Sequence, residues 1–296
     1  MPWLNHPKYI PTRDALIAQW SRKRQHFRRM RHVVFLCGGF NSSRRDQIDA
    51  YLAKFHKDLL VFYADNVWNH ISGRPGANAL LMEEQLAQLA DVVVIIVESP
   101  GTMAELGAFS VGDALRKKLL VLMKDRYKNS NSFINTGPIR WVDADSKFKP
   151  VIYTSFAPIL SCAVEIDERL SRLSAPRSQS VTDLPNRPKH LLFMLCDLVQ
   201  VIGPVRAEHA AFYLEKILGV PPVWQVDGLL GLASEIGFLE SKEVNGSRYY
   251  MVTDAQAQAK PFVYRRFLNL DEDRARMLSA LQRIAEPVDI LKNWTI

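Results

Sequence analysis

Short apolar segments alternate with helix-like segments through the middle of the chain. The apolar segments cover residues 32–36, 59–63, 91–97, 118–123 and 150–153. Residues 44–55, 78–89, 103–116 and 157–173 show the spacing of apolar side chains that is typical of helices. Regular alternation of strands and helices predicts a doubly wound α/β fold with a parallel sheet, and five strands favour a flavodoxin-like strand order.

The run from Val92 to Val97 is apolar at every position. Such a run is typical of a parallel strand that is covered by helices on both faces. Ligands of such sheets bind beyond the carboxyl ends of the strands, at the point where the strand order reverses. The loops that follow the strands, residues 37–41, 64–66, 98–104 and 124–140, are therefore the places where we expect a site.

A stretch rich in Pro, Ser and polar residues separates two parts of the chain at residues 174–188. It has no helical or strand periodicity and predicts a linker. We therefore expect a basic arm at residues 1–31, an α/β domain at 32–173 and a second domain at 189–296.

The second domain shows three helical patterns, at residues 190–202, 206–218 and 226–236, followed by two strand-like segments around Asn245-Gly246. Asn-Gly between alternating segments indicates a tight hairpin, so we expect a winged-helix-like domain. Its third helix has Asp227 and Glu235 but no Lys or Arg. Only Lys242 and Arg248 on the wing suggest phosphate contacts, which favours docking to protein or structured nucleic acid over reading of a duplex sequence. After residue 260 we expect the chain to resume as helix.

Composition agrees with a globular protein that has a full-sized core. Of 296 residues, 48% are hydrophobic and 23% are charged, and no apolar run approaches the length that a membrane helix needs. The three cysteines are far apart and form no CxxC pair, so we expect neither a metal site nor a disulfide. A reducing, cytoplasmic location fits this usage best.

The positive charge is concentrated at the N-terminus. The first 32 residues hold eight Lys and Arg but one acid, whereas the two signs balance in the rest of the chain. The segment 22–31, which includes Arg22, Lys23 and Arg24, is either a basic helix that neutralises phosphates or a solvated helix on its own domain.

The turn after the apolar strand 91–97 carries a carboxylate, Glu105, close to the start of a predicted helix. Ser99, Gly101 and Thr102 precede it and allow a ligand to approach the backbone and the free N–H groups of the first helical turn. Glu105 is either a catalytic carboxylate or the third residue of a capping box that begins at Thr102. Spacing alone favours the capping box.

Other candidate contacts follow the remaining strands. Gly38 and Gly39 permit close backbone approach, and Phe40 is either a stacking surface or a core residue. Asp65 is placed to hold ribose hydroxyls, although an Asp-Asn turn explains it equally well. In the loop 132–140, Asn135 is a candidate for bonding a base or ribose and Arg140 for meeting a phosphate.

Four segments, FLCGGF, YADN, ESPGTMAELGAFS and SFINTGPIR, resemble in order and spacing the effector proteins of one class of bacterial retrons. In these systems a reverse transcriptase makes a branched RNA–DNA, and the effector is a toxin in phage defence. The resemblance implies a nucleoside 2-deoxyribosyltransferase-like domain followed by a winged-helix-like domain. It also implies the reverse transcriptase and its RNA–DNA as partners, and self-association of the chain.

The same resemblance implies that Glu105 occupies the position of the transferase nucleophile and that an N-glycosidic bond is cleaved. NAD is the expected substrate, with nicotinamide as leaving group and no separate cofactor. Glu98 is either a second carboxylate of the site or a residue that closes the turn. Two other functions stay open: a nucleotide-sensing regulator that binds nucleic acid without turnover, and a true deoxyribosyltransferase.

Overall fold

The computed structural model describes residues 3–21, 26–29, 31–64, 78–175, 178–180, 184, 187–219, 223–252, 262–265 and 268–294. The chain divides into two compact units. One unit comprises residues 31–175, and the other combines residues 1–30 with residues 176–296. The first 30 residues thus belong to the same unit as the C-terminal part of the chain.

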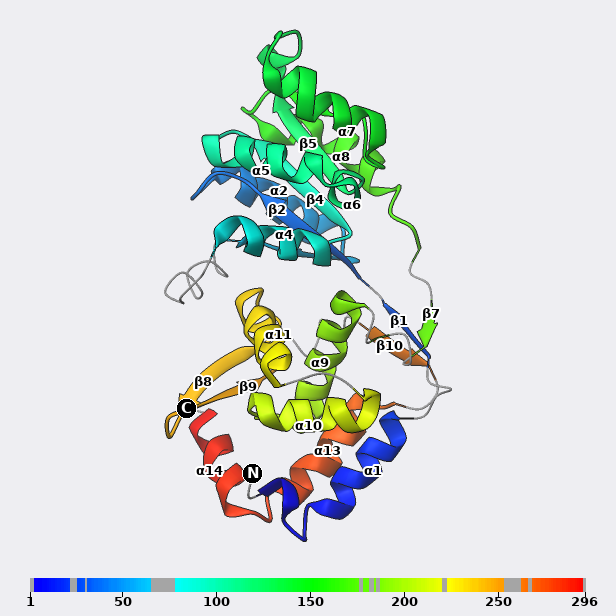
Figure 1. Ribbon diagram of the computed structural model, residues 1–296, viewed down its shortest axis with the longest axis vertical. Coiled ribbons are helices and arrows are strands. Elements are labelled where there is room, and N and C mark those ends of the chain that lie inside the picture. The colour runs from blue at the N-terminus through cyan, green and yellow to red at the C-terminus, as the bar shows by residue number, and fades with distance from the viewer. Residues whose placement is uncertain are drawn as a thin grey trace. The chain divides into compact units, whose positions relative to one another are not determined.

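The unit 31–175 is built on a five-stranded parallel sheet with the order β3-β2-β4-β5-β6 (Figure 1). Its strands are β2 (His32–Cys37), β3 (Leu59–Phe62), β4 (Val92–Val97), β5 (Leu119–Lys124) and β6 (Ile152–Thr154). Numbered along the unit this order is 2-1-3-4-5, that of flavodoxin-like folds. The predicted α/β class and strand order are therefore confirmed.

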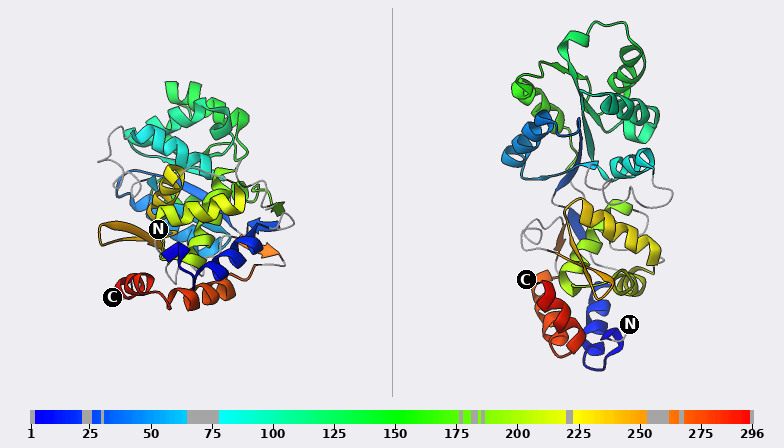
Figure 2. Two further views of the ribbon diagram at one scale, coloured as in Figure 1. Left: turned by 60° about the horizontal axis from the view of Figure 1, so that its bottom comes forward. Right: turned by 90° about the vertical axis from the view of Figure 1, so that its left-hand side faces the viewer.

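Helices cover both faces of this sheet (Figure 2). One face carries α2 (Ser43–Phe55), the short turn η4 (Ile159–Cys162) and α8 (Ala163–Leu170), and the other carries α4 (Ala79–Leu89) and α5 (Pro100–Val111). Every residue of β2 and β4 is buried, as the unbroken apolar run of β4 predicts. Burial of each Val or Ile side chain contributes about 1.5–3 kcal/mol, so these two strands anchor the unit.

Two predicted helices are interrupted. The segment 103–116 consists of α5 and the short α6 (Asp113–Arg116), which meet at Gly112 in an extended conformation. The segment 157–173 begins as η4 and becomes α8 only at Ala163. Between β5 and β6 lie the turn η2 (Asp125–Tyr127), a π-helical turn η3 (Asn135–Ile139) and α7 (Arg140–Asp145).

The C-terminal unit contains the predicted three helices and hairpin. The helices are α9 (Pro188–Ile202), α10 (Ala207–Leu218) and α11 (Val223–Glu235), and the hairpin pairs β8 (Glu240–Val244) with β9 (Ser247–Met251). Asn245 and Gly246 both have positive φ, 51° and 70°, as a two-residue hairpin turn requires. The assignment of these elements as a winged helix stays a prediction.

A small antiparallel sheet corrects two predictions. Its order is β10-β1-β7, with β1 at His26–Arg29, β7 at Ser178–Ser180 inside the predicted linker, and β10 at Phe262–Arg265. A basic helix is wrong for residues 26–29, and helix is wrong for 262–265. Partners far apart in sequence supply backbone hydrogen bonds that local periodicity does not encode. Helices α13 (Leu270–Leu281) and α14 (Ala285–Trp294) follow.

The N-terminal segment is anchored on this unit. It contains the turn η1 (Trp3–Asn5) and α1 (Ile10–Trp20). The hydroxyls of Tyr9 and Tyr213 lie 2.7 Å apart, and Trp20 Nε1 donates to Asp273 over 3.4 Å. These buried contacts bind the segment to α10 and α13. In the described parts of the chain, no helix has the length and apolar character needed to cross a bilayer.

Candidate functional site

The candidate site lies where the order of the parallel strands reverses, between β2 and β4. The chain leaves β2 through Gly38 and Gly39 and leaves β4 through Glu98 and Ser99. Both turns therefore lie at the same carboxyl edge of the sheet, on adjacent strands. Ligands of doubly wound sheets bind at this position.

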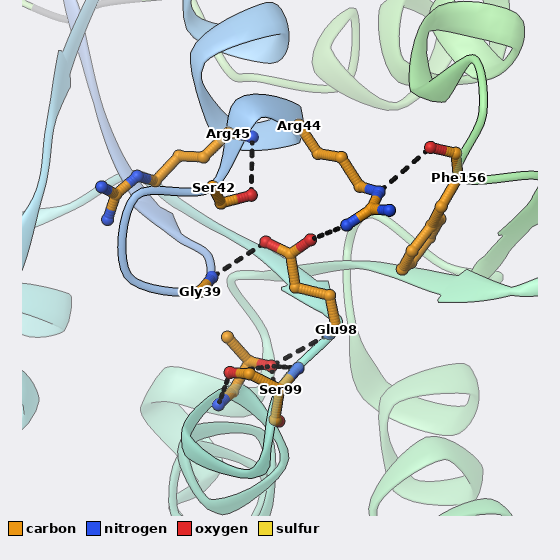
Figure 3. A network of polar contacts seen from close by, with 8 residues as sticks. Gly39, Ser42, Arg44, Arg45, Glu98, Ser99 and Phe156 are labelled. Carbon is orange, nitrogen blue, oxygen red and sulfur yellow. Dashed lines mark hydrogen bonds and ion pairs between the residues drawn. The ribbon is translucent and has the colours of Figure 1, made fainter.

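Glu98 ties these two turns together (Figure 3). Its Oε1 accepts a hydrogen bond from the backbone N–H of Gly39 at 2.9 Å, and its Oε2 accepts one from Arg44 Nη1 at 2.8 Å. Arg44 also donates through Nε to the carbonyl of Phe156 at 3.0 Å. One carboxylate thus connects the end of β4, the loop after β2 and the first turn of α2.

The protonation state of Glu98 follows from these contacts. Burial alone would raise the pKa of this carboxyl, because its side chain is only 6% exposed. Hydrogen bonds from Ser42, Arg44 and Gly39 outweigh burial and hold the pKa of Glu98 below its ordinary value. Glu98 is therefore an ionised residue that closes the turn, and it has no proton to give to a leaving group at neutral pH.

The turn after β4 is capped by residues other than those predicted. Ser99 is the N-cap of α5, and its side chain accepts a hydrogen bond from the backbone N–H of Thr102. The Thr102 hydroxyl accepts hydrogen bonds from the backbone N–H groups of Glu98 and Ser99, each at 3.0 Å. The prediction that Thr102 is the N-cap, with Glu105 as its capping partner, is wrong. The Thr102 hydroxyl is buried within the turn, whereas Gly101 is exposed.

Glu105 therefore takes no part in capping α5 and lies beyond the first turn of this helix. Its side chain is partly buried, with Oε2 buried, and it forms a hydrogen bond with the Cys37 side chain at the end of β2. Burial, followed by the nearby Glu105 charge, raises the pKa of the Cys37 thiol well above its ordinary value. The thiol thus stays protonated and is the donor to the carboxylate. The Glu105 carboxylate lies at the strand reversal, next to β2.

Two further charged groups surround Cys37, and sequence reasoning did not single them out. The charge of Glu83, from α4, also raises the pKa of Cys37, and that of Arg45, from α2, lowers it. The Arg45 guanidinium stacks over the Tyr63 ring, 4.7 Å from its centroid. Helical periodicity indicates that these residues lie on helices, but it does not show which of them face the end of β2.

The double glycine allows close packing within the protein. A Cβ at Gly38 would lie 3.0 Å from the Cβ of Arg45, and a Cβ at Gly39 would lie 3.4 Å from Glu98 Oε1. Phe40 is 80% exposed, so the core alternative for it is wrong, while its use as a stacking surface stays a prediction. Asp65 lies outside the described residues.

The loop 132–140 is held beside the helix that carries Glu105. Asn135 donates through Nδ2 to the carbonyls of Tyr127 at 2.7 Å and Ser130 at 2.8 Å, which closes the loop on itself. The π-helical turn η3, in which Asn135 lies, contacts α5. Such turns often mark functional sites. The Asn135 Nδ2 group is therefore used within the loop, whereas its Oδ1 is buried and has no hydrogen-bond partner among the described residues. Arg140 is exposed.

Lys242 and Arg248, the predicted nucleic-acid contacts of the wing, both interact with other residues of the chain. Lys242 Nζ lies 3.2 Å from the carbonyl of Trp294 and 5.4 Å from the centroid of its ring. Arg248 pairs with Glu243 at 3.8 Å and stays 43% exposed. Arg248 is thus the more available of the two for a phosphate. Arg22, Lys23 and Arg24 lie outside the described residues.

Comparison with known proteins places these features in a family. The sequence pattern of the STM3845 retron effector protein family matches residues 41–240. The chain belongs to this family. The match includes the turn that carries Glu105, the loop 132–140 and the helices α9 to α11, and it ends at the first residue of β8.

Two relatives from Escherichia coli are similar over parts of the chain. One, named "Retron Ec86 putative ribosyltransferase/DNA-binding protein", is 40% identical over 112 residues, which are 36% of each chain. The other, named "Retron Ec73 putative ribosyltransferase/DNA-binding protein", is 27% identical over 216 residues, 64% of this chain and 68% of the relative. The first match thus spans about a third of that relative. Family membership associates the protein with a retron system.

Proposed function

We propose that this retron effector cleaves an N-glycosidic bond of a nucleotide, with NAD as substrate and Glu105 as the catalytic carboxylate. One observation carries the proposal: the capping box of α5 is formed by Ser99 and Thr102, and the Glu105 carboxylate instead meets Cys37 at the strand reversal. The names of the two relatives, which include ribosyltransferase, support chemistry at a ribosyl carbon.

The chemistry requires negative charge near the anomeric carbon. As the C1′–N bond breaks, positive charge develops on the ribose, and a fixed carboxylate stabilises it or forms an ester with C1′. Water then adds to C1′ and releases one proton, giving ADP-ribose. The pyridinium nitrogen of NAD takes the electron pair of the broken bond, so nicotinamide leaves as a neutral molecule.

Nicotinamide is a leaving group that suits a site in which Glu98 has no proton to donate. Nicotinamide needs no proton on departure, whereas a purine leaving from an ordinary nucleoside needs one. Glu98 is ionised and bonded to Gly39 and Arg44, so it does not supply that proton. Glu83, whose charge also acts on Cys37, is the second carboxylate that we propose for this site.

The remaining assignments rest on the family. We infer that the reverse transcriptase and its branched RNA–DNA hold the effector in check, and that its activity is toxic once released. The C-terminal helices and hairpin, which we assign as a winged-helix-like domain, then dock on this complex. Because related transferases complete their sites across subunits, self-association belongs to the same proposal.

Nicotinamide release by purified Glu105→Gln tests the assignment. We expect the rate to fall by roughly 100-fold or more, the loss typical of removing a group that stabilises transition-state charge. Glu84→Gln, an exposed carboxylate on α4, is the matched control and should keep full activity. Undiminished nicotinamide release by the Glu105→Gln protein would overturn the proposal.

Product analysis separates the alternatives. Exchange of free bases among deoxynucleosides, without net hydrolysis, would indicate a deoxyribosyltransferase. Tight binding of NAD with no product of any kind would indicate a sensor. Both readouts use the full chain, with NAD, deoxynucleosides and nucleotides compared side by side.

A further inference from the structure

A polar cleft lies beyond β5 and β6, at the same carboxyl edge of the sheet as Glu105. Its volume is about 440 Å³. Residues of the segment 128–140 line it, together with Asp143 of α7 and Tyr153 of β6. Amide and hydroxyl groups from Asn129, Ser130, Asn131 and Thr136 line it as well.

Two cations at this cleft lack counter-ions. Lys128 and Arg140 are both exposed and line it, and neither forms an ion pair within the described ranges. Asp143, the acid of the cleft, accepts a hydrogen bond from the backbone N–H of Val151 at 2.7 Å. The cleft thus holds two cations and one acid, so its lining carries a net positive charge.

An aromatic ring of strand β6, that of Tyr153, lies close to one of these cations. The ammonium group of Lys128 is 5.9 Å from the centroid of the Tyr153 ring. The Tyr153 side chain is half-buried, which fixes the ring while leaving part of it accessible. Cations beside an ordered ring are the groups that recognise a nucleotide, whose phosphates are anionic and whose base stacks.

The position of the cleft fits one end of a long substrate. Glu105 acts between β2 and β4, whereas the cleft lies between β5 and β6, two strand spacings away in the sheet order. Neighbouring strands are about 4.8 Å apart, so the two places are separated by about 10 Å along the edge. The turn η3, which lines the cleft, contacts the helix of Glu105, so both belong to one surface.

We propose that this cleft binds the nucleoside diphosphate half of a dinucleotide substrate, remote from the bond that is cleaved. Lys128 and Arg140 bind the phosphates, and Tyr153 supports the ribose or base. This inference rests on the proposed function for the identity of the cleaved half. It adds a reason for a dinucleotide to be preferred over a nucleoside that lacks this half.

Binding of ADP to the Glu105→Gln protein tests the cleft without any need for turnover. Isothermal titration calorimetry should show one site, and Lys128→Gln with Arg140→Gln should weaken it by about 10- to 100-fold, the loss expected for hydrogen bonds to charged groups. Arg126→Gln is the matched control. This cation is exposed two residues before Lys128 and does not line the cleft, so its loss should leave the ADP affinity unchanged.

Initial rates give the second readout, on otherwise wild-type protein. The double variant should raise the KM for NAD by a similar factor, while the rate with nicotinamide riboside, which lacks the diphosphate half, should stay the same. Thermal unfolding of each variant shows whether the fold is intact.

The two proposals fail in different ways. If the Glu105→Gln protein does not bind ADP, or binds it equally well after loss of both cations, the cleft assignment is overturned. If ADP binding depends on both cations but no substrate is cleaved by wild-type protein, the cleft assignment stands and the proposed hydrolysis fails.

Discussion

The backbone N–H of Gly39 donates a hydrogen bond of 2.9 Å to Glu98 Oε1, and this bond joins the ends of two adjacent parallel strands. Glu98→Gln keeps the shape of the side chain but removes its charge and its ion pair with Arg44. We expect the unit 31–175 to lose roughly 1–3 kcal/mol of unfolding free energy, the cost of disturbing a hydrogen-bonded buried charge. Urea unfolding followed by hydrogen exchange in β2 and β4 measures this loss.

The same carboxylate makes stability depend on pH. Because the pKa of Glu98 is lower in the folded protein, its contribution is fully present above the unfolded value of about 4.3 and is lost as pH falls below it. In a plot of unfolding free energy against pH, Glu98→Gln should therefore reduce the loss of stability of this unit at acid pH. An unchanged loss of stability at acid pH would show that other carboxyl groups cause it.

Cys37 is predicted to position Glu105. Cys37→Ala removes the thiol donor, so the pKa of the Glu105 carboxyl should rise and the acid limb of the kcat profile should shift to higher pH. We expect kcat to fall roughly 3- to 10-fold with little change in KM, the scale of one modest hydrogen bond. Nicotinamide release measured across the acid limb, from roughly pH 4 to pH 8, checks this.

Two variants separate this role from simple packing. Cys37→Ser keeps a donor at the same place and should restore most of the activity. Cys162→Ala removes the same side chain from the opposite face of the sheet, within the cluster formed by α2 and α8, and should leave the pH profile unchanged. A shift of equal size in Cys162→Ala would contradict the positioning role.

Gly203 is predicted to tolerate no side chain. A Cβ there would lie 2.6 Å from the Val199 carbonyl and 3.3 Å from that of Tyr250, both of them backbone atoms. Gly203→Ala should destabilise the C-terminal unit by roughly 1–3 kcal/mol, as overpacking typically does. Thermal unfolding measures the effect. Gly231→Ala, in α11 with open space around its Cβ, should be neutral or stabilising by up to about 1 kcal/mol.

His209 is predicted to make the C-terminal unit acid-sensitive. Burial, followed by the charge of Arg206, lowers the pKa of this imidazole to about 3. Its folded value lies below the unfolded value of about 6.5, so stability is full above pH 6.5 and is lost as pH falls from there toward 3. Hydrogen exchange of α10 amides should accelerate across this window. His209→Gln should abolish this pH dependence of hydrogen exchange. If the variant keeps the full pH dependence, His209 is not its cause.

The periodicity of apolar residues was sufficient to predict the parallel sheet. All six residues of Val92–Val97 are buried, as an apolar run without alternation indicates, and each strand of the sheet begins and ends within two residues of its predicted position. The Asn245-Gly246 hairpin was equally readable, because its turn needs positive φ at both positions. These features depend on local chemistry, which a sequence contains directly.

The site was only partly predictable. Spacing alone made Thr102 and Glu105 a capping box, since a Thr followed three residues later by Glu satisfies that pattern. The helix instead begins at Pro100, and Ser99 and Thr102 cap it. Spacing could not show this, because a shift of the helix start by three residues depends on how the turn packs between Glu98 and the loop after β2.

What the sequence by itself determined is the α/β order, the edge of the sheet where a site lies, and Glu105 as a candidate. What only the tertiary structure decided is the direction of the carboxylates: Glu98 is bonded to Gly39 and Arg44, and Glu105 meets Cys37. It also paired residues 26–29 with 262–265, more than two hundred positions away. The reason is physical. The periodicity of apolar residues shows which positions of a helix or strand are buried, whereas the residue that each of them contacts depends on packing between segments that are distant in the chain.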